Sequence, residues 1–504
     1  MRKLLFVVVA CALSLAAAQW RRSDSCPAAD GQHIYIVTTN DIHSALDNVP
    51  RLASLVKQYR AKGDVLLVDS GDRCSGHTFV DDAPMPGASI VSLMNRLGYD
   101  AATLGNHEFD HGMEHLAELF DLYDFEIVCA NLAADDAARF GKLSAGCVFE
   151  RGGVKIAFAG VVDTEMINDG RITPAGKSAA FRGAKFSPAR ETAARVVDSL
   201  ARDNDFVVLL SHMGNKTDSL LALSSPSCRW IASGHSHDRR ATDVGGIHIS
   251  QNAKSLKYVT VADLTVRGGR IASVDYEQLP VSDFEPDPEY VEAVERIRAA
   301  MPEMFDTVGR AEYEATKDGV ANLFVEALAG HDYDGFRPEV TVYHFGGVRI
   351  GGIPAGDIPR WLIYDSDIFR STVFIGEMTR SELECLVKTK YNSQGADGGK
   401  DKESHYVYLR SDVPYRIDTL PGGDAERVVF PTLDDGRKYR VAMCNYVAEE
   451  YVDNYEGLKG VVDMRNTGIL VRDLLLERLA ASADGYRPDN RIKQYEASSE
   501  AGNY

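Results

Sequence analysis

The chain has 504 residues, of which 45% are hydrophobic and 26% charged, and its formal net charge is −19. This apolar content excludes an intrinsically disordered chain, and the absence of a glycine or proline period excludes a fibre. The acidic balance argues against a protein that coats nucleic acid, because that function needs clustered lysine and arginine. A small anionic substrate remains compatible with it, since local positive charge can dominate inside a cleft.

The first 18 residues have the pattern of a secretory signal peptide. Arg2 and Lys3 precede an apolar stretch, and the alanines at 16–18 provide a small-residue cleavage site before Gln19. The apolar stretch is shorter than the roughly 20 residues that a membrane span needs, so an N-terminal anchor is the weaker alternative. We expect an exported protein, periplasmic, cell-surface or secreted, without a transmembrane segment.

Eight cysteines are scattered along the chain, and Cys11 lies in the predicted leader. Their sparse spacing is not that of a disulfide framework, and no C-x-x-C pair suggests a structural zinc site. Cys129 and Cys147 could pair in an oxidising compartment, and the sequence leaves this open.

Residues 30–281 are predicted to form a layered α/β domain. Between the first two apolar runs, apolar side chains recur at helical spacing from Val49 to Tyr59. From 247 to 280 the pattern is rich in strands, with a turn at Gly268 and Gly269. The apolar runs that precede this part, and that we interpret as buried strands, lie at 33–39, 65–68, 127–130, 154–162, 206–210 and 230–233. Their alternation with amphipathic segments favours helices layered on sheets.

Residues 282–302 are predicted to be a linker helix. The segment starts with an acidic, proline-containing stretch, and its apolar residues then share one face of a helix that begins near Pro288 and stops before Pro302. Residues 303–495 are predicted to form a second domain, with helix patterns at 319–329, 379–390 and 467–482.

Five short polar motifs each follow an apolar run of the first domain. This places them at the carboxyl ends of strands, the edge at which open α/β sheets bind ligands. The motifs are Asp41-Ile42-His43, Gly71-Asp72, Gly105-Asn106-His107-Glu108-Phe109-Asp110, Ser211-His212 and Gly234-His235-Ser236-His237. Their Asp, Asn and His side chains suit Zn, Mn, Fe or Co better than Ca, which prefers oxygen ligands alone. Six or seven such ligands around one carboxylate can hold two metal ions about 3.5–4 Å apart, which clamp a phosphoryl group and deprotonate a water.

The order of these motifs resembles that of the calcineurin-like metallophosphoesterase superfamily, and specifically the secreted two-domain 5′-nucleotidases. The motifs match over residues 33–240, and the resemblance continues more loosely to about residue 482. It implies an α/β fold with an N-terminal four-layer α/β/β/α metallophosphoesterase sandwich and a C-terminal α/β substrate domain. It also implies two divalent transition-metal ions, which would be Zn, Mn, Co or Fe.

The resemblance further implies a role for each motif residue. Asp41, His43 and His237 would bind the first metal ion, Asp72 would bridge the two ions, and the second ion would be held by Asn106, His212 and His235. Many relatives have Gln or Asn where this chain has His237, but the wider superfamily also uses His there, so the ligand role is retained.

His107 and Asp110 resemble the catalytic dyad of the family. They are three residues apart at the start of an expected helix, so the two side chains can share one face. The Asp110 carboxylate would orient the imidazole, and His107 would stabilise the transition state and assist the leaving oxygen.

The second domain carries an altered form of the substrate-binding motif N-x-GG-x-R. Here it consists of His344, which replaces the Asn, followed by Gly346, Gly347 and Arg349. By resemblance, Arg349 would bind phosphate with its fork of donors. Two aromatic loops would follow, with Phe369 and Tyr455 stacking on a base. Asp453 matches the second loop, although the two glycines expected before it are missing.

The expected function is a phosphohydrolase that releases phosphate from nucleoside 5′-monophosphates or related nucleotides by attack of a metal-bound hydroxide. The altered loops of the second domain leave open a different leaving group, such as a nucleotide-sugar, a cyclic nucleotide or a sugar phosphate. A third hypothesis is a nucleotide-binding protein without turnover, which the complete set of ligands and the dyad disfavour. The expected partner is one small phosphate ester and no nucleic acid, and the sequence predicts no oligomeric state.

Overall fold

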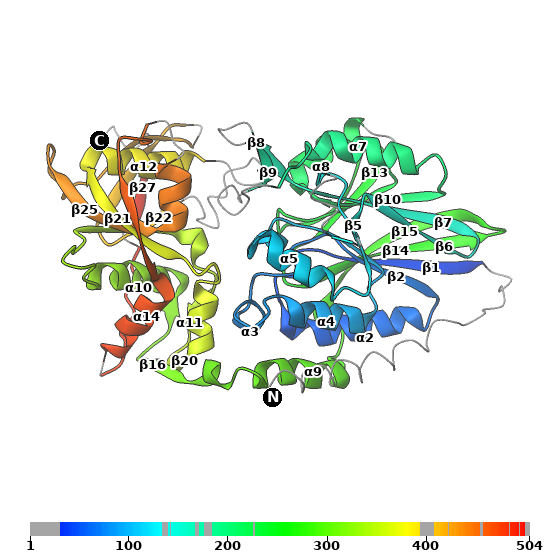
Figure 1. The fold of residues 1–504 in the computed structure, drawn as a ribbon, viewed down its shortest axis with the longest axis horizontal. Coiled ribbons are helices and arrows are strands. Elements are labelled where there is room, and N and C mark those ends of the chain that lie inside the picture. The colour runs from blue at the N-terminus through cyan, green and yellow to red at the C-terminus, as the bar shows by residue number, and fades with distance from the viewer. Residues whose placement is uncertain are drawn as a thin grey trace.

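Figure 1 shows two lobes, with helix α9 (Pro288–Ala299) running along the base of the N-terminal lobe before the chain enters the other lobe. Elements from the first part of the chain build one lobe, and elements after α9 build the other. This computed structural model describes residues 31–133, 140–141, 143–166, 171–175, 184–224, 227–393, 408–421, 423–453, 457–482, 484–492 and 494–498. The predicted signal peptide and Tyr455 lie outside the described residues.

A seven-stranded sheet forms the first half of the N-terminal lobe. Its strands β1 to β5 pair in parallel, and β14 and β15 extend the sheet antiparallel beyond β1. In spatial order the strands are β15 (Arg270–Pro280), β14 (Tyr258–Arg267), β1 (Gln32–Thr39), β2 (Asp64–Asp69), β3 (Ala101–Thr103), β4 (Glu126–Val128) and β5 (Leu143–Ser144).

A six-stranded sheet forms the second half of this lobe. Its four middle strands run in parallel, and one antiparallel strand flanks them at each edge. In spatial order the strands are β12 (Arg239–Val244), β13 (Ile247–Asn252), β11 (Trp230–Ser233), β10 (Phe206–His212), β7 (Val154–Val162) and β6 (Gly146–Arg151).

The two sheets pack face to face and are covered by helices on their outer faces. Alternation along β1 shows how one strand serves two layers: Ile34 and Ile36 enter the core between the sheets, whereas Tyr35 and Val37 face the helices. The helices on the seven-stranded sheet are α2 (Val49–Arg60), α4 (Ala88–Leu97) and α5 (Gly112–Phe120), and those on the six-stranded sheet are α7 (Ala189–Leu200) and α8 (Gly214–Ser224). The expected four-layer α/β/β/α sandwich is confirmed.

The C-terminal lobe is built around a five-stranded sheet with one large core of its own. Its strands, in spatial order, are β22 (Leu409–Ser411), β18 (Val340–His344), β25 (Lys438–Cys444), β21 (Thr372–Thr379) and β26 (Met464–Leu470). Its helices are α10 (Lys317–Gly330), α11 (Arg360–Ser366), α12 (Arg380–Asn392), α13 (Asn445–Val447) and α14 (Val471–Ala480), with a π-helical turn over Ala448–Val452.

Shorter strand pairs complete both lobes. In the N-terminal lobe β8 (Thr164–Met166) pairs with β9 (Ile172–Pro174). The others are β16 (Thr307–Ala311) with β20 (Gly356–Pro359), β17 (Ala315–Thr316) with β19 (Gly352–Ile353), and β23 (Tyr415–Thr419) with both β24 (Ala425–Val429) and β27 (Gln494–Ser498).

Several expectations can be compared with these bounds. The helix predicted from Val49 is present as α2, but the helix predicted over 467–482 was too long, because its first four residues complete strand β26 against β21. Cys129 and Cys147 are both free thiols. No helix in the described part of the chain combines the length and apolar character needed to cross a membrane. The domain boundaries remain predictions.

Candidate active site

The predicted metal ligands meet where strand ends of the two sheets face each other. Asp41 and His43 follow β1, Asp72 follows β2 and Asn106 follows β3, all in the seven-stranded sheet. From the six-stranded sheet, His212 is the last residue of β10, and His235 and His237 follow β11. Each sheet gathers its own residues at one edge, and the packing of the two sheets brings the edges together, so side chains up to 196 positions apart meet, from Asp41 to His237.

Asp41, His43, Asp72 and His237 form the first of two overlapping clusters that could hold a metal ion. The Nε2 atoms of His43 and His237 lie 2.9 Å apart. Asp41 Oδ1 lies 3.4 Å from His237 Nε2 and 3.9 Å from His43 Nε2. Four ligand atoms thus surround one small space.

Asp72 also belongs to the second cluster, with His212 and His235. Its Oδ2 atom lies 3.9 Å from His43 Nε2 on one side and 3.0 Å from His212 Nε2 on the other. The amide oxygen of Asn106 lies 3.0 Å from His235 Nδ1, where it could add an oxygen ligand to this cluster. Asp72 therefore lies between the two clusters, where one carboxylate could serve two ions.

The hydrogen bonds of two histidines show that these clusters fit metal ions. His43 Nδ1 lies 2.7 Å from the carbonyl oxygen of Ser75, and His212 Nδ1 lies 2.7 Å from that of Ser70. A carbonyl only accepts, so each Nδ1 carries the proton and each Nε2 presents a lone pair to the cluster. Buried His212 Nε2 has no well-directed hydrogen bond within the described structure, as expected of a nitrogen placed to bind a cation.

The pKa values of His43 and His235 agree with a role as neutral ligands. Burial, with the neighbouring His237, lowers the pKa of His43 well below its usual range. Burial and His212 lower the pKa of His235 to about 3. His212 differs, because the carboxylates of Asp72 and Asp41 outweigh the effect of burial and raise its pKa to about 10. A proton on His212 Nε2 would occupy the place that a cation would take.

The backbone of the site is held in an unusual conformation. Asp41, His43, Asp72, His235 and His237 all have positive φ angles, between 47° and 79°. Such left-handed residues cost about 1–3 kcal/mol each and persist only where the surroundings enforce them. One enforcing contact is the close approach at Gly105, where an added Cβ would lie 2.2 Å from Asp72 Oδ1. These five candidate ligands are thus positioned by the fold itself.

The predicted dyad is also brought together. His107 Nδ1 lies 2.8 Å from Asp110 Oδ2. His107 begins a 3₁₀ turn, η3 (His107–Phe109), and Asp110 follows it directly, so the dyad does not lie at the start of an α-helix, which begins only at Gly112 (α5). The backbone N–H of His107 donates to Asp72 Oδ1 at 2.8 Å, so the dyad is fixed directly to the central carboxylate.

Glu108 supports the site without entering it. Its buried carboxylate accepts from the backbone N–H groups of Asp72 (2.9 Å), Arg73 (2.9 Å) and Gly105 (2.6 Å). Arg73 is fully buried beside Glu108 and Asp69. The pair of Arg73 and Glu108 ties the loop after β2 to the loop after β3, and this holds Asp72 next to the dyad.

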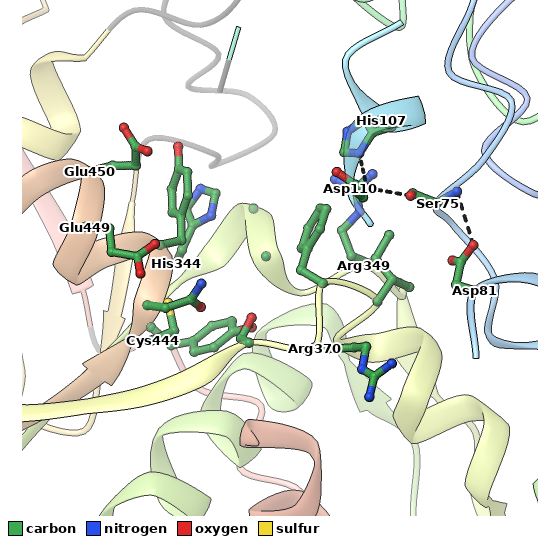
Figure 2. Close-up of a pocket in the computed structure, with 18 of the residues that line it drawn as sticks. Ser75, Asp81, His107, Asp110, His344, Arg349, Arg370, Cys444, Glu449 and Glu450 are labelled. Atoms are coloured by element: carbon green, nitrogen blue, oxygen red, sulfur yellow. Dashed lines mark hydrogen bonds and ion pairs between the residues drawn. The ribbon is translucent and has the colours of Figure 1, made fainter. Parts of the chain in front are cut away.

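A cavity of about 650 Å³ lies between the dyad and the C-terminal lobe (Figure 2). Asn106, His107 and Asp110 line it from the N-terminal lobe, and the predicted substrate residues that line it from the other lobe are Gly346, Gly347, Arg349 and Phe369. Asp453 is exposed and does not belong to this lining, so its role remains a prediction, as does that of Tyr455.

Sequence reasoning missed part of this lining. Asn445, Tyr446, Glu449 and Glu450 line the cavity from the segment in which only Asp453 and Tyr455 had been named. The strand-end rule applied to β25 would have indicated Asn445 and Tyr446, which follow it directly. Glu449 and Glu450 lie in the π-helical turn, which has no simple sequence signature.

Ring contacts show how the aromatic residues of the cavity are used. The Phe369 ring stacks on His107 with centroids 5.9 Å apart, and the Arg349 guanidinium lies over Phe369 at 5.3 Å. Tyr446 stacks on His344 at 4.6 Å. His344, which stands where the motif N-x-GG-x-R has its Asn, thus contacts an aromatic residue at the end of the cavity away from the dyad.

Comparison with known proteins matches this architecture. Residues 34–239 match the family of calcineurin-like phosphoesterases. The chain is 25% identical to protein UshA of Yersinia enterocolitica over 499 residues, which cover 86% of each chain. It is 22% identical to the trifunctional nucleotide phosphoesterase protein YfkN of Bacillus subtilis, covering 94% of this chain and 36% of that protein.

A solved structure shows the same fold. The 5′-nucleotidase precursor from Thermus thermophilus superimposes with a TM-score of 0.76 at 21% identity, covering 92% of this chain and 99% of that one. The chain spans between about a quarter and a half of the length of the first four curated relatives that it matches.

Proposed function

We propose that this protein is a metal-dependent phosphoric ester hydrolase of the two-domain 5′-nucleotidase type, within the calcineurin-like metallophosphoesterases. Its proposed substrates are nucleoside 5′-monophosphates or related nucleotides. The observation that carries the proposal is one cavity lined by the His107–Asp110 dyad on one side and by Arg349, Phe369 and Tyr446 on the other.

The seven predicted ligands are proposed to hold two divalent ions. Asp41, His43 and His237 would hold one ion, and the second would be held by Asn106, His212 and His235, with Asp72 shared between them. When bound, such ions lower the pKa of water to near neutrality and neutralise charge on phosphoryl oxygens. The donor set of oxygen and imidazole nitrogen suits Zn, Mn, Co or Fe.

The chain's own groups have separate proposed tasks. Arg349 is always charged and presents a planar fork of donors, so it would bind the phosphoryl group from the side of the C-terminal lobe. His107 would donate a proton to the leaving oxygen while Asp110, 2.8 Å from its Nδ1, keeps the ring oriented. The Phe369 ring, stacked on His107, would exclude water from this side of the cavity.

One observation favours a second candidate substrate class. The rings of His344 and Tyr446 stack on each other at 4.6 Å, so no slot for a base lies between them. A leaving group at that end would contact the outside of this pair and the carboxylates of Glu449 and Glu450, which line the same end. Carboxylates accept hydrogen bonds from hydroxyl groups, so a sugar phosphate or a nucleotide-sugar is the alternative, with a cyclic nucleotide beside it.

Metal removal and a substrate panel together test the proposed function. Purified protein should release phosphate from 5′-AMP, lose this activity in EDTA, and regain it when Mn or Zn is added. Comparing kcat/KM for 5′-AMP, a nucleotide-sugar, a cyclic nucleotide and a sugar phosphate then identifies the leaving group. Metal-loaded protein that hydrolyses none of these esters would contradict the proposal and favour nucleotide binding without turnover.

Export by the N-terminal signal peptide is proposed from the sequence pattern of residues 1–18. Expressed with its leader in a secreting host, the protein should be recovered outside the cytoplasm with Gln19 as its first residue, as measured by mass spectrometry of the intact protein. Recovery of uncleaved protein from the cytoplasm would contradict this proposal. Replacing the basic pair Arg2 and Lys3 by glutamate provides a control that should impair export.

A further inference from the structure

We propose that Ser75 is a positioning residue for hydrolysis, which orients the dyad with its hydroxyl group; the inference rests on the proposed function. Ser75 lies in the loop after β2, three residues beyond Asp72. Its three polar groups contact three different parts of the site, and Figure 2 shows the contacts with Asp110 and Asp81. The hydroxyl donates to Asp110 Oδ2 at 2.5 Å, the carbonyl oxygen accepts from His43 Nδ1 at 2.7 Å, and the backbone N–H donates to Asp81 Oδ1 at 3.1 Å.

The hydroxyl shares an acceptor atom with the dyad histidine. Asp110 Oδ2 accepts both from Ser75 Oγ and from His107 Nδ1. Because an ionised carboxylate only accepts, the Ser75 hydroxyl is the donor in this contact. Two donors that converge on one oxygen restrict rotation of the carboxylate, and a charge-assisted O–H···O⁻ bond is among the stronger hydrogen bonds in proteins. Ser75 therefore fixes the group that orients His107.

The backbone of Ser75 is fixed independently of its hydroxyl. The residue has a φ angle of +64°, in the left-handed region. The carboxylate of Asp81 accepts from the N–H groups of Ser75 (3.1 Å), Gly76 (2.7 Å) and His77 (2.9 Å). At Gly76 an added Cβ would lie 2.1 Å from the carbonyl oxygen of His43, so the loop packs tightly on the metal-ligand segment. The loop is therefore held through its own backbone N–H groups and its packing, without the Ser75 hydroxyl.

This separation distinguishes positioning from a merely structural role. The bond to His43 uses the carbonyl oxygen of Ser75, which every substitution retains. The bonds to Asp81 use backbone N–H groups, which are also retained. Removing the hydroxyl should therefore disturb Asp110 and leave both the loop and the metal ligand His43 in place.

A double-mutant cycle tests the proposal. Ser75→Ala should lower kcat by roughly 10–100-fold, the scale of one hydrogen bond to a charged group, while KM and metal content stay within about twofold of the wild type. In an Asp110→Ala background, Ser75→Ala should cause no further loss, because its effect acts through Asp110. Ser75→Gly, which lacks the hydroxyl and accepts a positive φ, should match Ser75→Ala and serves if the alanine variant folds poorly.

Ser44→Ala is the matched control. Ser44 is also a buried, left-handed serine, and its hydroxyl donates to the same Asp81, at 3.2 Å. The kcat of the Ser44→Ala variant should stay within about twofold of the wild type. A wild-type kcat in Ser75→Gly would overturn the inference while leaving the proposed function intact. The same holds if Ser75→Ala lowers kcat by the same factor in the wild type and in Asp110→Ala. A wild type that hydrolyses no ester would instead overturn both.

Discussion

Replacing His107 by alanine is expected to lower kcat by roughly 10²–10⁴, the usual contribution of a group that transfers a proton in the transition state. The imidazole lies in the cavity wall, is fixed by Asp110 at 2.8 Å, and has its backbone N–H bonded to Asp72. Steady-state kinetics on the best substrate of the panel measures the effect. Since the metal ligands are untouched, the metal content should equal that of the wild type.

His115→Ala is the control for this variant. His115 lies eight residues further along, in α5, and its Nε2 contacts the carbonyl oxygen of Pro86. Its kcat should remain close to that of the wild type. An unchanged rate in His107→Ala would refute the proposed role. The loss should also shrink for an ester with a leaving group so acidic that it needs no proton.

Asp72→Asn is expected to lower kcat by roughly 10³-fold or more and to reduce the bound metal. The amide retains an oxygen that can accept from the N–H of His107, but it places an NH₂ group where Oδ2 now faces His43 and His212. Metal ions contribute several kcal/mol of charge stabilisation, and each 1.36 kcal/mol corresponds to a factor of ten in rate. Elemental analysis of the purified variant measures the metal directly.

The control for Asp72→Asn removes a carboxylate far from the site. Asp243 is 77% exposed and pairs with His248 on the six-stranded sheet. Asp243→Asn should retain both metal content and kcat. If Asp72→Asn bound as much metal as the wild type, the bridging role proposed for Asp72 would be wrong, whatever its activity.

The layered fold, and the grouping of the proposed ligands within each sheet, follow from the sequence for one physical reason. Buried parallel strands leave long apolar runs, and the residues after them meet at one edge of their own sheet. This places Asp41 near Asp72, whereas His212 ends a strand of the other sheet, and its position next to them depends on how the two sheets pack. Where the apolar run is only three residues long, as in β3, the strand itself gave little signal.

Features set by loop geometry could not be predicted in this way. Ser75 and Asp81 meet through a left-handed turn, and no periodicity records which way such a turn points its side chains. Likewise, the segment after β25 was identified as part of the substrate site, but the π-helical turn decides that Glu449 and Glu450 line the cavity. The helix predicted from residue 467 began too early because an edge strand can be as amphipathic as a helix start.

The left-handed backbone at five of the proposed metal ligands also limits how this site can change. Apart from glycine, the side chains that tolerate such a conformation best are Asn, Asp and His, which are themselves ligands for hard and borderline metals. The backbone conformation thus restricts which residue types can serve as ligands at these positions, independently of the metal. Cysteine, glutamate or a β-branched residue would have to bear the strain as well as bind the ion. A shift in metal preference, in evolution or by design, should therefore proceed by exchanges among Asp, Asn and His, or through their hydrogen-bond partners, rather than by introducing thiolates.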